Sequence, residues 1–232
     1  MHRLRWDLAV CHCANRRISM ADTSASEPLT KSPRIGPNAI LQLEEPLDRM
    51  LGQGALAQIL KISRVAMPSG QEMVPQEDVG QVHHTMWRLF PQQAEILSEH
   101  AGAGTARYIA ANRIPKAARV LLRVLPRGLA ERLLTKAISD HAWTFCGSGV
   151  LDTRREGGEI HFMLRENPLA DKLTQPPHRC IWHAAVFAEL FSLVLGRAYF
   201  CKEISCCALG ADLCHFVVSR TRPTGHFKGL QL

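Results

Sequence analysis

Apolar residues in the first half of the chain recur at the three- and four-residue spacing of helices. The pattern is clear at Ile40, Leu43 and Leu47, and it returns over residues 56–62. It continues in the segments QQAEILSEHAGAGTARYIAANRI, KAARVLLRVL and RGLAERLLTKAISDHA, each of which follows a proline that could open a helix. On the last segment one helical face is shared by Leu129, Leu133, Ala137 and His141. We therefore predict helices from Pro37 to about His141.

The pattern changes after His141. The stretch WTFCGSGVLDTRREGGEIHFMLRENPL predicts two strands joined by a turn at Arg154–Gly158. A strongly apolar segment predicts a buried helix from about Cys180 to Leu195, and Gly196 is a natural stop. RAYFCKEIS and CHFVVSR predict a second hairpin. Together these patterns predict an α+β fold, in which a helical N-terminal half precedes an antiparallel sheet packed on a long buried helix.

The two ends of the chain lack such patterns. Residues 1–34 mix Ser, Thr, Arg and Pro without apolar periodicity and predict a disordered tail, within which Met20 is an alternative start. Residues 221–232 are rich in turn-forming residues and predict a flexible C-terminal tail. We therefore expect residues 35–220 to form one domain.

No apolar run is long enough to span a membrane. The longest, AAVFAELFSLVLG, is interrupted by Glu189, and the apolar run Leu8–Val10 is too short for a secretory signal. We therefore expect a cytoplasmic protein, a compartment in which stable disulfides are rare. The cysteines are then expected to bind metal or to be buried.

The net charge of +7 is concentrated in one segment. Between Arg107 and Lys136 there are eight basic residues and one acid, Glu131. Four of them share one helical face if the intervening proline only kinks the helix: Lys116, Arg119, Arg123 and Arg127. This stripe is either a solvated face or a docking surface for ligand carboxylates, anionic lipid headgroups or an acidic partner. Nucleic acid is not expected, because no DNA-binding motif or interleaved aromatic residues accompany the charge.

Two short motifs carry little chemistry. GAGTAR, residues 102–107, resembles a dinucleotide fingerprint, but it follows a helix and Arg107 replaces the third glycine. We interpret it as a helix kink or an interhelical turn, and no nicotinamide or flavin motif is visible elsewhere. His83 and His84 point about 100° apart on a helix, so we expect one exposed and one half-buried histidine and no metal site there.

Four of the eight cysteines lie within CKEISCCALGADLC, residues 201–214. Cys206 and Cys214 flank the predicted turn and should lie close in space. Cys180 opens the buried helix, where amide groups favour a thiolate. Zinc needs about four N, S or O ligands in a tetrahedron, but cysteines also serve as small buried hydrophobic residues. The spacing alone leaves both interpretations open.

Several motifs in order resemble a known family. HAWTFCGSG, ENPL, CIWHAAVFAELFSLVLG and the Cys-rich hairpin resemble the 4-vinyl reductase domain. With RIPKAARVLLRVLPRGLAERLL upstream, the stretch Ile35–Ser219 resembles the bacteriochlorophyll 4-vinyl reductase family of photosynthetic bacteria. The resemblance implies that residues 35–220 are a ligand-binding domain of this type, with a fold related to trafficking-complex subunits. It also implies an apolar ligand pocket, a homodimer, and partners among the enzymes of bacteriochlorophyll biosynthesis.

The resemblance also assigns the cysteines. In related domains of aromatic-sensing transcription activators, zinc is held by a cysteine at the start of the long helix, a Glu-x-x-Cys and a final cysteine. The matching positions are Cys180, Glu203, Cys206 and Cys214. Four protein ligands leave no open position, which implies a structural zinc. Glu203 and Cys206 have opposite strand parity, so a bulge or strand end must bring them together. Cys201 and Cys207 fall outside the pattern and are expected to be packing residues.

The family name implies vinyl reduction, but such chemistry needs a nicotinamide, flavin or iron–sulfur cofactor for which the residues give no motif. We therefore favour a protein that binds and presents a tetrapyrrole intermediate, in the cytoplasm or at the surface of the photosynthetic membrane, and leave catalysis open. The alternatives are a true divinyl protochlorophyllide 8-vinyl (4-vinyl) reductase with an external reductant, and a sensory module for another small aromatic ligand. Candidate pocket walls, each of which could equally be core, are Trp143, Phe145, Phe162, Trp182, Phe187 and Phe191. Candidate magnesium ligands are His141, His161 and His183.

Overall fold

The computed structural model describes residues 32–170 and 180–222. Met20 and nearly all of the predicted N-terminal tail lie outside the described residues, as does most of the predicted C-terminal tail. Within the described part, no helix combines the length and the apolar character needed to cross a membrane.

The N-terminal part is helical, as the periodicity predicts. Its elements are α1 (Asn38–Leu41), α2 (Glu44–Leu51), α3 (Ala55–Ser63), α4 (Gln76–Leu89) and α5 (Ala94–Asn112). Two short strands, β1 (Arg34–Ile35) and β2 (Val74–Pro75), pair antiparallel beside them. The apolar faces of these helices enclose a core that includes Ile40, Leu47, Ile59 and Met86. This burial is the main source of stability for helices that are too short to persist alone in water.

The basic stripe does not lie on one continuous helix. Leu125 is extended, and Pro126 precedes a new helix, so the segment divides into α6 (Lys116–Val124) and α7 (Arg127–Asp140). The face that the periodicity suggested for α7 is also not the buried one, because Leu129 and Leu133 are exposed. The buried face of α7 is formed by Ala130, Glu131, Leu134, Thr135 and Ile138.

The sheet begins later than predicted. Residues Trp143–Cys146 form a short helix, α8, and Gly147 at φ 58° follows it, so the predicted strand start at Trp143 is wrong. The strands are β3 (Val150–Glu156), β4 (Glu159–Arg165), β5 (Phe200–Ser205) and β6 (Cys214–Ser219). They form one antiparallel sheet in the order β3-β4-β6-β5, and η1 (Cys207–Leu209) lies in the second hairpin. The α+β class predicted from the sequence is confirmed.

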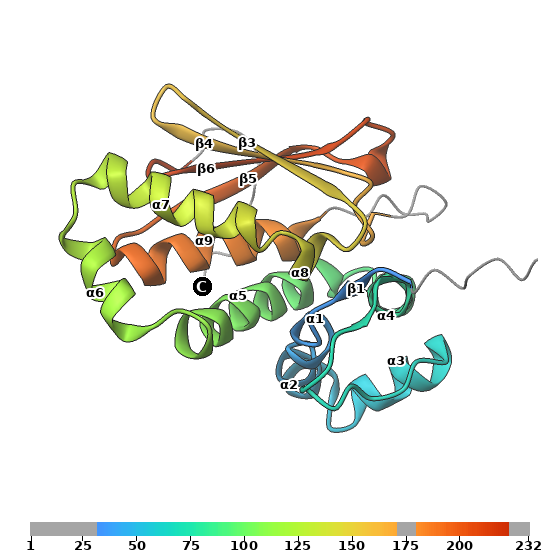
Figure 1. Cartoon of the computed structure of the whole chain (residues 1–232). Coiled ribbons are helices and arrows are strands. Elements are labelled where there is room, and N and C mark those ends of the chain that lie inside the picture. Colours follow the sequence, from blue (N-terminus) through green and yellow to red (C-terminus); the bar gives the residue numbers. More distant parts are fainter. Residues whose placement is uncertain (1–31, 171–179, 223–232) are drawn as a thin grey trace, which may run out of the picture. The chain divides into compact units, whose positions relative to one another are not determined.

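Helix α9 (Ile181–Leu195) is the centre of the domain. It packs against the sheet on one side and against α5 on the other, and Figure 1 shows these layers with α7 also under the sheet. Its N-terminal residues Ile181 and Trp182 belong to the core of the N-terminal helices. Phe187 and Phe191 belong to the core under the sheet. The long buried helix is therefore confirmed, and it joins the two cores.

The glycine motif has a packing role. Gly102 lies inside the unbroken helix α5, so the predicted kink or interhelical turn at GAGTAR is wrong. A Cβ atom at Gly102 would lie 2.8 Å from the Cβ of Ala185 and closer still to the carbonyl oxygen of Trp182. Glycine is therefore needed where α5 and α9 approach most closely, a long-range contact that the motif itself does not reveal.

Candidate metal centre

The structure brings together the four side chains that the resemblance assigned. One ligand atom from each of Cys180, Glu203, Cys206 and Cys214 lies within 4.8 Å of the others. Cys180 is the residue before α9, Glu203 is on β5, Cys206 follows β5, and Cys214 begins β6. The start of the long helix and both sides of the hairpin therefore meet at one point.

A register shift makes this meeting possible. Glu203 pairs with Phe216, but Ser205 pairs with His215, so β5 holds an extra residue between Glu203 and Ser205. A bulge of this kind re-aims the following side chains and changes their parity. The predicted irregularity between Glu203 and Cys206 is confirmed.

The sulfur positions suit a tetrahedral ion. Cys180 Sγ lies 3.5 Å from both Cys206 Sγ and Cys214 Sγ, and the latter two lie 3.9 Å apart. Sulfurs bound at 2.3 Å to one tetrahedral zinc are about 3.8 Å apart, whereas disulfide sulfurs are about 2.05 Å apart. The three thiols therefore form a cluster that could bind a metal ion.

Glu203 completes the donor set. Its Oε2 accepts a hydrogen bond of 2.9 Å from the Cys180 amide, which orients the carboxylate. Its Oε1 is buried and has no hydrogen-bond partner among the described residues. A buried oxygen without a partner is costly. A cation among the three sulfurs would satisfy it.

The cluster shares protons unequally. The pKa of Cys206 is lowered, because the thiols of Cys180 and Cys214 donate to its sulfur. The same hydrogen bonds, together with burial, raise the pKa of Cys180. Burial and the neighbouring negative sulfur raise the pKa of Glu203 to about 8. Without a metal the cluster therefore retains protons, and a bound dication would displace them.

Asn167 supports the cluster, although sequence reasoning did not select it. Its Nδ2 lies 3.1 Å from Cys180 Sγ and 3.5 Å from Cys214 Sγ, and its Oδ1 accepts from the Leu169 amide. Hydrogen bonds of this kind orient metal ligands and tune their charge. The Asn-Pro turn in ENPL was the available signal, since asparagine there often bonds to its own backbone.

The aromatic residues proposed as pocket walls are mostly core. Phe162 stacks on Phe187 with ring centroids 4.3 Å apart, and Phe187 also makes an edge contact with Phe145. Trp182 and Phe191 are buried, whereas Trp143 is exposed. Their role around a ligand stays a prediction.

The proposed magnesium ligands are scattered. His141 is exposed and its Nδ1 bonds to the Ala137 carbonyl, and His161 Nδ1 lies 3.0 Å from His215 Nε2. Burial lowers the pKa of His183 to about 3, so that ring is neutral. His83 is buried and His84 half-buried, so the prediction that one of that pair is exposed is wrong.

The basic stripe serves several ends. Arg123 Nη2 donates at 2.7 Å to the carbonyl of Leu193, near the C-terminus of α9. Arg127 lies 3.7 Å from Glu131, whose buried carboxylate also accepts from Tyr199 and Arg155. Arg119 is half-buried and Lys116 is exposed. The stripe is thus divided between structural contacts and solvent, and its docking role stays a prediction.

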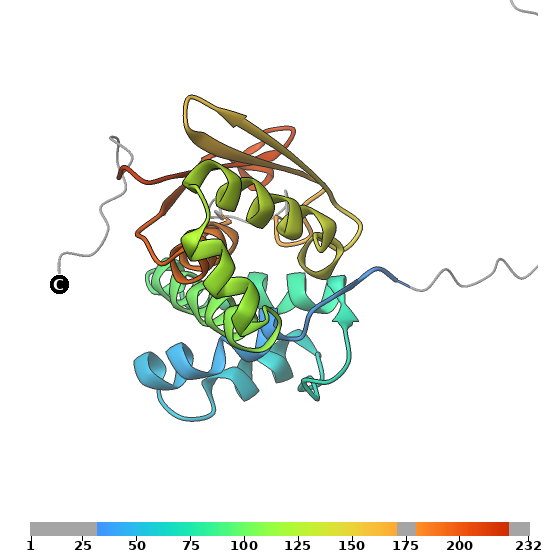
Figure 2. The ribbon, with the colours of Figure 1, turned by 60° about the vertical axis from the view of Figure 1, so that its left-hand side comes forward.

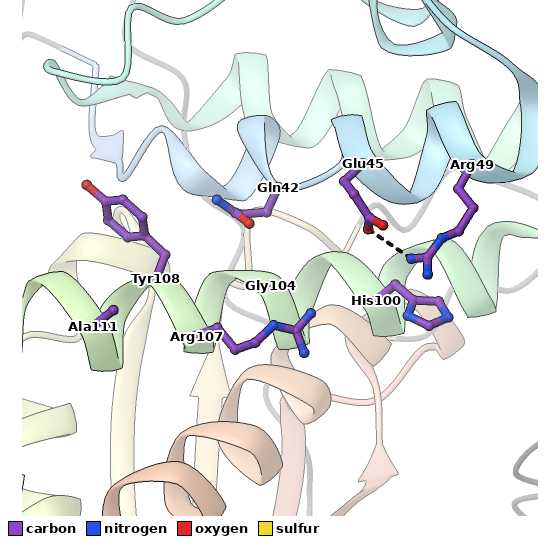
Figure 3. A pocket seen from close by; sticks show the side chains of 8 residues that line it. All are labelled: Gln42, Glu45, Arg49, His100, Gly104, Arg107, Tyr108 and Ala111. Atoms are coloured by element: carbon purple, nitrogen blue, oxygen red, sulfur yellow. Dashed lines mark hydrogen bonds and ion pairs between the residues drawn. The ribbon is translucent and has the colours of Figure 1, made fainter.

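Sequence reasoning also missed a groove between α2 and α5. Its volume is about 690 Å³, and Figure 3 shows its lining residues: Gln42, Glu45, Arg49, His100, Gly104, Arg107, Tyr108 and Ala111. Arg49 pairs with Glu45 at 2.9 Å, and Arg107 lies 3.5 Å from Glu189. On α5 the lining positions recur every three or four residues from His100 to Ala111. That spacing was visible in the sequence, but the helix opposite was not.

Comparison with known proteins identifies relatives. A model of the 4-vinyl reductase domain matches residues 160–220. The bacteriochlorophyll synthase 23 kDa chain of Cereibacter sphaeroides is 39% identical over 199 residues, which cover 84% of this chain and 96% of the relative. The protein of the same name from Rhodobacter capsulatus is 38% identical over 196 residues, which cover 84% and 91%.

Similar solved structures support the fold alone. An H-NOX protein from S. oneidensis in the Fe(II)NO ligation state matches with a TM-score of 0.52 at 8% identity, covering 81% of this chain and 100% of that one. A trafficking protein particle complex subunit 3 from Naegleria fowleri, covalently bound to palmitic acid, matches with a TM-score of 0.51 at 14% identity, covering 63% and 95%. The sequence relatives are decisive for the family: the chain belongs to the family of the bacteriochlorophyll synthase 23 kDa chain and contains a 4-vinyl reductase domain.

Proposed function

We propose that this protein binds a tetrapyrrole intermediate of bacteriochlorophyll biosynthesis in the groove between α2 and α5 and presents it to enzymes of the pathway. The observation that carries the proposal is the groove itself, because its volume of about 690 Å³ lies in the range of small-molecule sites. The named role of the relatives supplies the pathway.

The lining of the groove suits a planar carboxylate ligand. Arg49 and Arg107 are exposed guanidinium groups on opposite helices, and arginine binds carboxylates through two parallel hydrogen bonds. Tyr108 offers a half-buried aromatic face, and Gly104 leaves the middle of the α5 wall without a side chain. A macrocycle could therefore lie along α5 while its carboxylates displace Glu45 and Glu189 from the two arginines.

The metal centre has a separate role in this proposal. Cys180, Cys206, Cys214 and Glu203 would hold a zinc ion that joins the start of α9 to the β5–β6 hairpin. When bound, zinc would supply no more than cross-linking, since four protein donors fill its tetrahedron. The thiol-rich donor set favours zinc over magnesium or calcium, which prefer oxygen ligands.

Spectral titration of the purified protein with magnesium protoporphyrin and metal-free protoporphyrin tests the proposal. We expect a saturable change in the porphyrin absorption band, and about tenfold weaker binding in Arg107→Gln, because a charge-assisted hydrogen bond contributes about 1.5–3 kcal/mol. The matched control is Arg88→Gln, an exposed arginine on α4 outside the groove. Porphyrin dimethyl ester should bind wild type and Arg107→Gln equally, because it offers no carboxylate.

Three outcomes would count against this function. Absence of saturable binding, or equal binding by Arg107→Gln and Arg88→Gln, would remove the groove as the site. Reduction of divinyl protochlorophyllide by the purified protein with NADPH or ferredoxin alone would favour the reductase alternative. Elemental analysis of the intact protein decides the zinc assignment independently, since the groove and the metal cluster share no residue.

A further inference from the structure

The outward face of α6 and α7 is apolar. Val120, Leu121 and Val124 on α6 are 62%, 54% and 74% exposed, and Leu129 and Leu133 on α7 are each 44% exposed. We call these five residues the α6–α7 ridge. Figure 2 shows both helices on the side of the molecule that is turned towards the viewer. Ridge residues of this size are normally buried, so this surface needs an occupant.

The ridge is not a by-product of packing. Ala118 and Leu122 are the half-buried aliphatic positions of α6, and residue 120 lies about 160° around the helix from residue 122. Val120 and Val124 therefore point away from the domain. None of the residues of α6 is buried, so its outward face carries its largest aliphatic exposure while folding requires only the opposite side.

Positive charge surrounds the ridge. Lys116 and Arg132 are exposed, and no hydrogen bond or ion pair engages them within the described residues. Lys136 is exposed and bonds only to Asp140, its neighbour one turn on. Glu131, the sole acid between residues 107 and 136, is buried beneath this surface against Tyr199 and Arg155. The surface presented by α6 therefore combines aliphatic side chains with uncompensated cations.

We propose that the α6–α7 ridge binds the surface of an anionic lipid bilayer, with its aliphatic side chains in the interfacial layer and Lys116 and Arg132 against the headgroups. Helices that bind this way carry an apolar face flanked by lysine and arginine. Each cation near an anionic leaflet contributes about 1 kcal/mol. A second copy of the chain fits less well, because both copies would bring the same positive segment to the contact. This proposal does not depend on the ligand of the groove.

Vesicle flotation with the full-length protein tests the ridge. We expect binding to vesicles of phosphatidylcholine and phosphatidylglycerol in equal parts, little binding to phosphatidylcholine alone, and release at high salt. The double variant Val120→Ser/Val124→Ser should bind anionic vesicles about tenfold less, because two valines no longer enter the interface. These positions are exposed, so the variant should fold, which circular dichroism checks.

The matched control is Ile62→Ser/Met67→Ser, which removes two other aliphatic side chains that are each 49% exposed. It should bind anionic vesicles as wild type does. The proposal fails if wild type ignores anionic vesicles, or if both double variants bind equally. A wild-type dimer that Val120→Ser/Val124→Ser converts to monomer, without vesicle binding by either, would assign the ridge to a second copy instead.

Discussion

Replacement of Gly102 by alanine should destabilise the protein even though alanine is the better helix former. In an open helix the change would gain about 1 kcal/mol. Here the new methyl group would lie 2.8 Å from Ala185 Cβ and would also meet the carbonyl oxygen of Trp182 on α9. Ordinary carbon contacts need about 3.5 Å or more, so α5 and α9 would have to separate by about 0.7 Å. Overpacking of this kind costs about 1–3 kcal/mol, and the obstacle here is backbone that cannot rotate away. We expect a net loss of about 1–2 kcal/mol.

Urea denaturation followed by circular dichroism measures this loss. The matched control is Gly128→Ala near the start of α7, where a Cβ would meet nothing within 4 Å. That change should stabilise the protein by about 0.4–1 kcal/mol. The two identical substitutions should therefore shift the midpoint in opposite directions. If Gly102→Ala is as stable as Gly128→Ala, the close approach of α5 to α9 is not a constraint and the reasoning is refuted.

Three further predictions concern buried polar groups. Cys206→Ser should lose bound metal and melt at a lower temperature than wild type, while chelator treatment should lower the melting temperature of wild type but not of the variant; an equal effect on both would contradict the cluster as the metal site. The pKa of His183 is lowered by burial to about 3, below its unfolded value of about 6.5, so stability is full above pH 6.5 and falls by about 1.4 kcal/mol per pH unit as pH drops towards 3. His183→Leu should show a shallower slope in denaturant melts over that range, and an unchanged slope would refute the assignment. Glu131→Ala should cost about 3–5 kcal/mol because it leaves the cation of Arg155 without its buried partner, whereas Tyr199→Phe removes one hydrogen bond and should cost about 1–2 kcal/mol. Equal losses in denaturation would show that the ion pair is not the dominant contact.

The metal cluster shows how far sequence reasoning reached. Resemblance assigned all four residues, and strand parity required the irregularity that appears between Glu203 and Ser205. The donor from Asn167 was not foreseen, because its partners Cys180 and Cys214 are distant in sequence and meet only in the folded chain. Hydrogen bonds between remote residues leave no periodic signal.

The sequence by itself determined the order of helices and strands, the buried character of α9 and the concentration of positive charge before residue 137. These features follow from local spacing, because side-chain periodicity decides which faces can be apolar. Only the tertiary structure decided which apolar face is covered. Leu129 and Leu133 satisfy helical spacing as well as Leu134 and Ile138 do, yet the first pair faces solvent and the second faces the core. Spacing defines the faces of a helix, but burial depends on the neighbour that arrives from elsewhere in the chain, and the groove beside α5 and the glycine at its contact with α9 depend on such neighbours in the same way.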